Sequence, residues 1–297
     1  MLEFELLAPD LYLLKTPFAA LWSGVFLLRG EESILIDSGA GADTVDNVIV
    51  PALEKLGVPL NSIKWIVNTH AHGDHAFGNA RLMEVTGAKL AAFDDAVDKF
   101  VNPLVYSIKT RAKYPEYSPK PPASLPSLTP DLVLHDGDTL MDRIKIFSTP
   151  GHDTECISVL DLKTNSLMTG DSLQFGGTRS SAGSDIAFYK DLPGYRETIA
   201  KIRAIAPENL FSSHDYQPSG CAFFGREEVE RCLDICVEVA DTYSNWVGDL
   251  LDAGIDDVAE IARTLIRKTG GVEPAFIFTD MYTADEHIEE VKRLRGE

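Results

Sequence analysis

The 297-residue sequence has few cysteines and no long apolar run, and both shortages exclude classes of protein. No run approaches the roughly 18 to 20 apolar residues of a membrane span, and the acidic start MLEFELLAPD lacks the positive charge of a signal peptide. The four cysteines have no paired C-x-x-C spacing, which favours reduced, mostly buried thiols over a disulfide framework or a zinc knuckle. They are Cys156, Cys221, Cys232 and Cys236. We therefore expect a cytoplasmic protein.

Basic residues are also scarce. The chain has 27 Lys and Arg against 46 Asp and Glu, a formal net charge of −19. Such a charge repels phosphate backbones and anionic lipid headgroups, so we expect neither a nucleic-acid nor a membrane partner. Because 44% of the residues are hydrophobic, the chain can bury a substantial core. Its length predicts one large domain, with or without a smaller appendage.

Strand-like and helix-like segments alternate along the first part of the chain. Apolar runs at 24–39, 64–70 and 144–148 are typical of buried strands that end in polar loops. Segments 44–57 and 77–87 have helical spacing and end in glycine. Two strand-rich halves with helices between them predict sheet packed on sheet inside a helical coat.

Two further regions depart from this alternation. Residues 94–130 begin with helical spacing and pass into a proline-rich stretch that sustains neither a helix nor a central strand. Residues 219–297 carry apolar stripes at helical spacing. We expect this second region to cap the rest of the fold or to form a homodimer contact.

The first of these regions is a basic, aromatic island in an acidic chain. Between residues 103 and 125 Glu116 is the sole acid. The cations and tyrosines there are Lys109, Arg111, Lys113, Lys120, Tyr106, Tyr114 and Tyr117. One interpretation is a lid that contacts a carboxylate or phosphate of a substrate, above all through Tyr106, Arg111 and Lys113. The other is a solvated surface excursion.

Histidine is rare, yet three of the seven histidines and an aspartate fall within six residues of NTHAHGDHAFGN, residues 68–79. They are His70, His72, Asp74 and His75. Imidazole and carboxylate groups together suit zinc, iron or manganese, and a two-metal site would hold its ions about 3.5–4 Å apart. More ligands of the same kind follow predicted strands: His152 in TPGHDT, Asp171 in MTGDSL and His214 in SSHDY. His135 and His287 lack such a setting, and we expect both on the surface.

This ordered set resembles the metallo-β-lactamase-fold hydrolases over about residues 10 to 218. The resemblance implies a four-layer αββα sandwich with the site at the edge where both sheets end. It implies a catalytic domain at 1–218, containing the 94–130 insertion, and a helical C-terminal extension at 219–297. It also implies two divalent ions, Zn²⁺ first, with Mn²⁺ or Fe²⁺ as alternatives.

The resemblance assigns each candidate ligand a position. His70, His72 and His152 would hold the first ion, Asp74, His75 and His214 the second, and Asp171 would bridge both. Asp37, in LIDSG, matches the family's acid that supports the ligand loop, and a turn or helix-cap role is its alternative.

The chemistry that the resemblance implies is hydrolysis by a hydroxide shared between the two ions. Asp74 would move a proton to the leaving group. Tyr216 would donate to an oxyanion or a leaving group, or pack in the core. His75 and Asp171 differ from the class B1 β-lactamase pattern, and His72 differs from the glutamate of the diiron oxygen-reducing branch. The short acidic chain lacks the inserted domain or basic exosite of the RNA-processing branches. What remains resembles the glyoxalase II, acyl-homoserine lactonase and quinolone-signal thioesterase branch. We therefore expect an ester, thioester or lactone substrate, with an anionic substrate as one option.

Three other functions fit the same candidate ligands. The same metal site could serve a phosphodiesterase or phosphotriesterase, a persulfide dioxygenase-like iron oxidoreductase, or a non-catalytic metal-binding effector. The segment 173–189 predicts a rim loop at the site. Its Phe175, Arg179 and Phe188 either line the substrate pocket or pack without a functional role.

Overall fold

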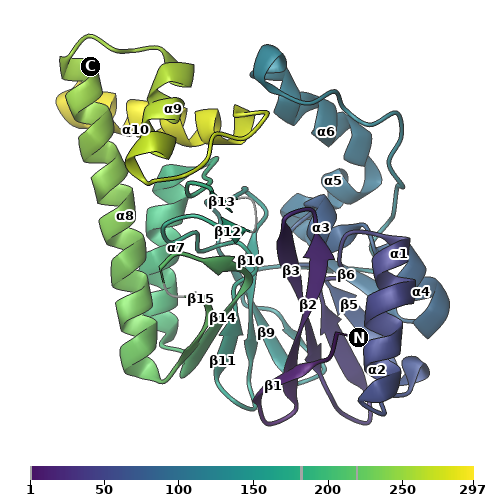
Figure 1. The fold of residues 1–297 in the computed structure, drawn as a ribbon. Helices are drawn as coiled ribbons and strands as arrows, with labels where there is room; N and C mark the ends of the chain where they lie inside the picture. The colour runs from purple at the N-terminus through teal and green to yellow at the C-terminus, as the bar shows by residue number, and fades with distance from the viewer. Residues whose placement is uncertain (1, 181–182, 219) are drawn as a thin grey trace.

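The apolar runs of the sequence form two β-sheets that pack face to face, with helices on both outer surfaces (Figure 1). The computed structural model describes residues 2–180, 183–218 and 220–297. The predicted αββα sandwich is confirmed.

The first sheet has strand order β1-β2-β3-β4-β5-β6-β7. Its strands are β1 (Glu5–Ala8), β2 (Leu11–Phe18), β3 (Leu21–Leu28), β4 (Ser33–Ile36), β5 (Ile63–Val67), β6 (Lys89–Phe93) and β7 (Leu132–Leu134). β1 to β4 pair antiparallel, whereas β4 to β7 run parallel. Because parallel strands end at one edge, the loops that follow β4 and β5 lie together.

The second sheet has strand order β15-β14-β11-β10-β9-β8. Its strands are β8 (Thr139–Leu140), β9 (Ile144–Ser148), β10 (Ile157–Asp161), β11 (Ser166–Met168), β14 (Asn209–Tyr216) and β15 (Gly220–Phe224). β11 and β14 run parallel, and the other pairs are antiparallel. A small separate pair, β12 (Arg179–Ser180) and β13 (Gly183–Ser184), follows β11 in the chain.

The two sheets are held together by an apolar layer between them. Phe26 and Val67 from the first sheet meet Val159, Met168 and Phe211 from the second, and all five are fully buried. Burial of each such side chain stabilises the fold by about 1.5–3 kcal/mol. This layer fixes the two sheets against each other, so the loops at their common edge keep a defined geometry.

Helices cover the outer face of the first sheet. They are α1 (Ala42–Thr44), the π-helical turn η1 (Val45–Ile49), α2 (Val50–Lys55), the 3₁₀ turn η2 (Leu60–Ser62) and α4 (Asn79–Thr86). The short helix α3 (Gly73–Ala76) precedes α4 and packs its Ala76 into the cluster between the sheets. Val45, Leu53 and Leu82 from these helices are buried against Leu27 and Ile66 of the sheet.

Helices α7 (Leu192–Ile205), α8 (Arg226–Asp252), α9 (Val258–Lys268) and α10 (Phe278–Arg295) follow in the second half. α8 buries Val229, Cys232, Cys236 and Ala240 at helical spacing in the same core cluster as β14 residue Leu210. Because β15 is part of the second sheet, the helical region begins at Arg226 and not at 219. Residue 219 itself lies outside the described residues.

Residues 94–130 connect β6 to β7 through η3 (Asp94–Ala96), α5 (Val97–Val101), α6 (Pro103–Ala112) and η4 (Pro115–Tyr117). In Figure 1, α5 and α6 lie above the sheet edge, across from α9 and α10. Tyr282 Oη donates to Thr110 O at 2.9 Å, and Tyr114 Oη donates to Asp285 Oδ2 at 3.1 Å. The insertion is therefore docked against the start of α10.

The two histidines outside the candidate site differ in their exposure. His135 is exposed, but the prediction of a surface position for His287 is wrong, because this residue is fully buried among Tyr189, Tyr243 and the helices. All four cysteines are free, and three are buried. Within the described ranges, no helix combines the length and apolarity needed to cross a membrane.

Candidate dimetal centre

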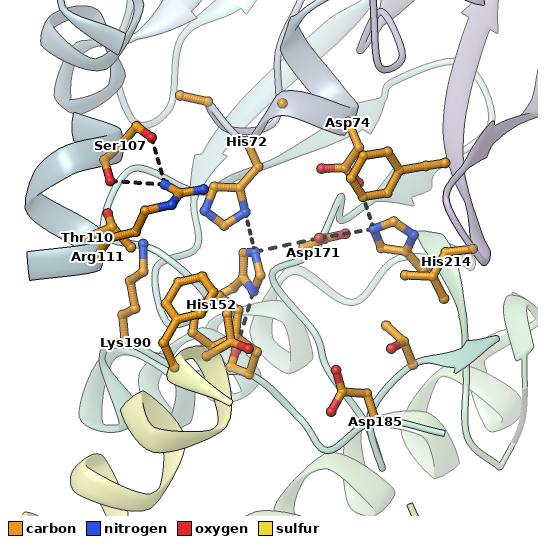
Figure 2. Close-up of a pocket in the computed structure, with 18 of the residues that line it drawn as sticks. His72, Asp74, Ser107, Thr110, Arg111, His152, Asp171, Asp185, Lys190 and His214 are labelled. Carbon is orange, nitrogen blue, oxygen red and sulfur yellow. Dashed lines mark hydrogen bonds and ion pairs between the residues drawn. The ribbon is translucent and has the colours of Figure 1, made fainter. Parts of the chain in front are cut away.

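The predicted ligands come from five loops or strand ends at the shared edge of the two sheets. His70 and His72 follow β5, Asp74 and His75 lie in α3, His152 follows β9, Asp171 follows β11, and His214 lies inside β14. Figure 2 shows the side chains of His72, Asp74, His152, Asp171 and His214 turned toward one another. Placing His214 after a strand was wrong by a few residues, because β14 continues to Tyr216.

The structure sorts these side chains into two triads, which match the sets named from the sequence. The first triad is His70, His72 and His152, and the second triad is Asp74, His75 and His214. Within each triad the candidate ligand atoms all lie within 4.8 Å of one another, and His70, His75 and Asp171 form a third such group.

Asp171 lies between the two triads. Its Oδ2 is 3.8 Å from His70 Nε2 and 3.6 Å from His152 Nε2 in the first triad. The same oxygen is 3.5 Å from His75 Nε2 and 3.3 Å from His214 Nε2 in the second triad. One carboxylate oxygen is therefore within reach of both sets, as a bridging ligand requires.

Hydrogen bonds from the surrounding protein orient the imidazoles. His214 Nδ1 lies 2.6 Å from Trp22 O, and His152 Nδ1 lies 3.3 Å from Phe188 O, so each Nδ1 donates and leaves Nε2 facing the centre. His70 Nδ1 is 3.1 Å from Thr69 Oγ1. Such outer hydrogen bonds fix the tautomer and the ring orientation of a metal-binding histidine.

Asp37 performs this task for the ligand loop. It is fully buried, and its Oδ2 accepts from His75 Nδ1 at 2.8 Å and from Thr69 Oγ1 at 2.9 Å. Its Oδ1 accepts from the backbone N of Thr69 at 2.8 Å. The structure thus places Asp37 behind the histidine-rich loop, where the sequence predicts a supporting acid.

Burial and charge prepare the donor atoms. Burial holds the pKa of His70 and His72 below the ordinary histidine value and lowers the pKa of His152 to about 3, so the first triad is neutral at pH 7. Burial opposes the ionisation of Asp74 and Asp171, but the neighbouring second-triad imidazoles outweigh it and hold the pKa of both carboxyls well below its usual range. Burial disfavours protonation of His75 and His214, but Asp74 and Asp171 outweigh it and raise the pKa of His75 well above its usual value and that of His214 to about 10. Because neutral imidazoles and ionised carboxylates bind a divalent cation, an ion in the second triad would displace these protons.

Two orphaned atoms show that the residues fit a metal. His70 Nε2 and Asp171 Oδ1 are buried and have no hydrogen-bond partner within the described part of the chain. A buried polar atom without a partner costs roughly 1–3 kcal/mol, so such atoms call for an explanation. His70 Nε2 of the first triad lies 3.8 Å from Asp171 Oδ2, and Asp171 Oδ1 belongs to the carboxylate between the triads, so a divalent ion bound there would satisfy them. The nitrogen and oxygen donor set suits Zn²⁺, Mn²⁺ or Fe²⁺.

Sequence reasoning missed a charged network beside the first triad. His72 Nε2 lies 3.4 Å from Asp153 Oδ2 and 3.0 Å from Tyr106 Oη, which leaves His72 Nδ1 facing His152. Asp153 also binds Lys99 at 2.6 Å and Lys190 at 2.5 Å. The sequence offers one signal for this network, because Asp153 directly follows the predicted ligand His152. No local sequence pattern predicts that Lys99 and Lys190 contact Asp153.

The cavity over the centre has a volume of about 650 Å³. Its polar lining includes Asp74, Asp171, Tyr216 and ligands from both triads. Its apolar lining includes Phe18, Leu21, Phe77, Phe188 and Phe278. Tyr106, Arg111 and Lys120 enter from the 94–130 insertion. A concave, largely apolar pocket with a few polar groups is typical of a small-molecule site.

Three residues expected at the substrate lie elsewhere. Phe175 is fully buried and stacks on Phe223 at 5.2 Å, because a large apolar ring gains most from the core. Arg179 is exposed on β12, outside the cavity wall. Lys113 pairs with Asp285 at 2.6 Å instead of lining the cavity. Lys113 lies two positions after Arg111, and residues two apart do not share a helix face.

Two other aromatic residues that the sequence offers for the site do line the cavity. Phe188 lines the cavity, and residues 181 and 182 of the predicted rim loop lie outside the described residues. Tyr216 lines the cavity and is also fully buried, so it meets both interpretations. Its hydroxyl accepts from Gln174 Nε2 at 3.1 Å.

Comparisons with known proteins agree with this geometry. Residues 23–214 match the family model of the metallo-beta-lactamase superfamily. A beta-lactamase-like protein 2 homolog of Drosophila melanogaster is 29% identical over 194 residues, which cover 63% of this chain and 59% of that protein. A hydroxyacylglutathione hydrolase of Rhodopseudomonas palustris is 26% identical over 179 residues, covering 59% of this chain and 56% of that protein. The chain thus spans less than two thirds of the length of these relatives.

Solved structures show the same fold. A metallo-beta-lactamase family protein from Thermus thermophilus superposes with a TM-score of 0.73 at 18% identity, covering 96% of this chain and 95% of that one. A subclass B3 metallo-beta-lactamase of Bradyrhizobium japonicum gives a TM-score of 0.59 at 21% identity, covering 84% and 96%. The family model covers most of the chain and includes every candidate ligand. The chain therefore belongs to the metallo-beta-lactamase superfamily.

Proposed function

We propose that this protein is a binuclear metal-dependent hydrolase that cleaves an ester, thioester or lactone. The observation that carries the proposal is the position of Asp171 Oδ2, within 3.8 Å of imidazoles from both triads at the floor of the cavity. A carboxylate oxygen within reach of two ligand sets supports a two-ion hydrolytic site.

The first triad would hold one divalent ion and the second triad the other, with Asp171 binding both. Bound ions of this kind polarise a carbonyl group and lower the pKa of water toward neutrality. Zn²⁺ is the first candidate, because imidazole and carboxylate ligands without sulfur suit it well, with Mn²⁺ or Fe²⁺ as alternatives.

The chain's own groups would position the substrate and move its protons. Asp74 lines the cavity and would carry a proton to the leaving group. Burial raises the pKa of Tyr216 well above the usual tyrosine value, so its hydroxyl stays protonated and can donate to a developing oxyanion. The apolar wall formed by Phe18, Leu21 and Phe77 would exclude bulk water from the acyl chain.

One relative supports an acyl substrate. The Rhodopseudomonas palustris relative carries the name hydroxyacylglutathione hydrolase, which specifies hydrolysis of an acyl compound. The cavity of about 650 Å³ is large enough for a small acyl molecule.

The test combines metal analysis with a substrate panel. Protein purified without added metal is analysed for its elements and then assayed on a lactone, a thioester, an aryl ester and a bis-aryl phosphate. We expect two divalent ions per chain and turnover of a carbonyl substrate that Asp171→Asn abolishes. Faster turnover of the phosphate would favour a phosphodiesterase instead. One iron per chain with oxygen consumption on a persulfide would replace hydrolysis by oxidation.

A further inference from the structure

We propose that Arg111 is a substrate-binding residue that grips a carboxylate or other oxyanion on the acyl substrate. The inference rests on the proposed acyl hydrolase function and names the class of substrate, an acyl compound with an anionic group away from the scissile carbonyl. The inference comes from the contacts that hold the Arg111 guanidinium in the cavity wall.

Arg111 is positioned by its own helix and not by an acid. Its Nη1 donates to Ser107 O at 3.0 Å and to Ser107 Oγ at 2.6 Å, as the dashed lines in Figure 2 mark. The guanidinium carbon lies 5.8 Å from the centre of the Phe278 ring. Arg111 Nε is buried and has no hydrogen-bond partner among the described residues. No carboxylate in those residues lies within 4.0 Å of the guanidinium nitrogens.

Three nearby lysines differ in this respect. Lys99 and Lys190 both bind Asp153, and Lys113 binds Asp285. Arg111 is partly buried in the cavity wall, and no ion pair with an acid of the described residues satisfies it, although the chain has 46 acids. A charge that is withdrawn from water without compensation is costly, so the site favours a ligand that supplies the missing negative charge.

The geometry of the free edge selects the ligand. Nη1 is engaged with Ser107, and Nε and Nη2 share the other edge. Nε is buried, so a ligand would meet Nη2 first, and pairing both parallel donors with the two oxygens of a carboxylate or a phosphate requires the atoms over Nε to move aside. Lys120 lines the same cavity and adds positive charge. Asp185 also lines the cavity, and Figure 2 places it on the opposite side of the site from Arg111. An anionic group would be repelled there and drawn to Arg111.

Matched pairs of substrates test the proposal. Mono-4-nitrophenyl esters of linear dicarboxylic acids, from succinate to suberate, are compared with the same esters whose free carboxylate is capped as a methyl ester. We expect the metal-loaded protein to release nitrophenolate from both kinds of ester. At the best chain length, we expect capping to raise KM about 10- to 100-fold in the wild type, which is the effect of one lost charge-assisted hydrogen-bonded pair.

Two substitutions separate a specific contact from general electrostatics. Arg111→Met should remove the preference for the free carboxylate, and Arg111→Lys should keep a reduced preference because it retains the charge but not the two parallel donors. Lys113→Met is the matched control, since it removes one cation two residues away that faces Asp285. It should keep the full preference. A wild type without preference, or equal losses in Arg111→Met and Lys113→Met, would overturn the proposal.

A binding measurement separates this inference from the proposed function. Isothermal titration calorimetry of the free dicarboxylate into metal-loaded protein should show affinity that falls about 10- to 100-fold in Arg111→Met and not in Lys113→Met. Arg111-dependent binding without hydrolysis of any ester would overturn the hydrolase proposal and support the anion site. Hydrolysis together with dicarboxylate binding that does not depend on Arg111 would support the hydrolase proposal and overturn the anion site.

Discussion

Replacing Asp37 by asparagine tests whether the carboxylate behind the ligand loop sets the metal affinity. Oδ2 of Asp37 faces His75 Nδ1 at 2.8 Å and Thr69 Oγ1 at 2.9 Å, and Oδ1 faces the backbone N of Thr69 at 2.8 Å. An amide of the same shape has one acceptor and one donor, so in either orientation its NH₂ meets a group that also donates. If it meets His75, the ring must move its proton to Nε2, the atom that faces Asp74 and Asp171.

We expect Asp37→Asn to weaken Zn²⁺ binding about 10- to 100-fold, the usual effect of losing an outer hydrogen bond to a ligand. The free energy of unfolding of the metal-free protein should fall by about 3 kcal/mol, because a buried donor loses its partner. The matched control is Asp161→Asn. Asp161 is equally buried and binds Arg143 Nε at 2.6 Å. It lies at the end of β10 away from the ligand loops, where it pairs with Ile144 and Ser166.

The assay is competition for Zn²⁺ against a chromophoric chelator, with urea unfolding of the metal-free protein measured in parallel. Asp161→Asn should lose comparable stability while its Zn²⁺ affinity stays unchanged. The reasoning would be refuted by an Asp37→Asn affinity within about threefold of the wild type, where at least tenfold is expected. Equal weakening of Zn²⁺ binding in both variants would refute it as well.

Three further predictions concern pH, backbone conformation and metal removal. Burial lowers the pKa of His287 from 6.5 to about 3, so its contribution to stability is complete above pH 6.5 and is lost as the pH falls toward 3. The loss is about 1.4 kcal/mol per pH unit, and His287→Gln should show a flatter dependence of the melting temperature between pH 7.5 and about pH 5. Gly170→Ala should cost about 2–4 kcal/mol in urea unfolding, because φ is +53° and the new Cβ would lie 2.5 Å from Thr69 Oγ1. Its control, Gly254→Ala, has φ +78° with open space and should cost only about 1 kcal/mol; equal costs would contradict the overlap. A chelator should lower the melting temperature and stop hydrolysis, and added Zn²⁺ should restore both, since an ion at about 1,000 times its Kd stabilises by about 4 kcal/mol. An unchanged melting temperature would count against a bound metal.

The sequence by itself determined the layers of the fold and the identity of the candidate ligands. Side chains alternate between the two faces of a strand. Runs that are apolar at every second residue, or apolar throughout, therefore indicate strands from the sequence alone. The rare histidines and the aspartates that follow these runs marked the candidate ligands. The resemblance to the metallo-β-lactamase-fold hydrolases then assigned them to the sets around His70 and Asp74 before any coordinates.

Only the tertiary structure decided which side chains reach the cavity and which are paired. Phe175 and His287 look like rim and surface residues in the sequence, yet both are buried. Phe175 packs against Tyr216 and Phe223, and His287 of α10 packs against Tyr189 and Tyr243. Lys99 and Lys190 meet Asp153 from distant segments, a contact that no local pattern encodes. Local sequence sets backbone preference and periodicity. The environment of a charge is set by residues far along the chain, so it exists only once the chain has folded.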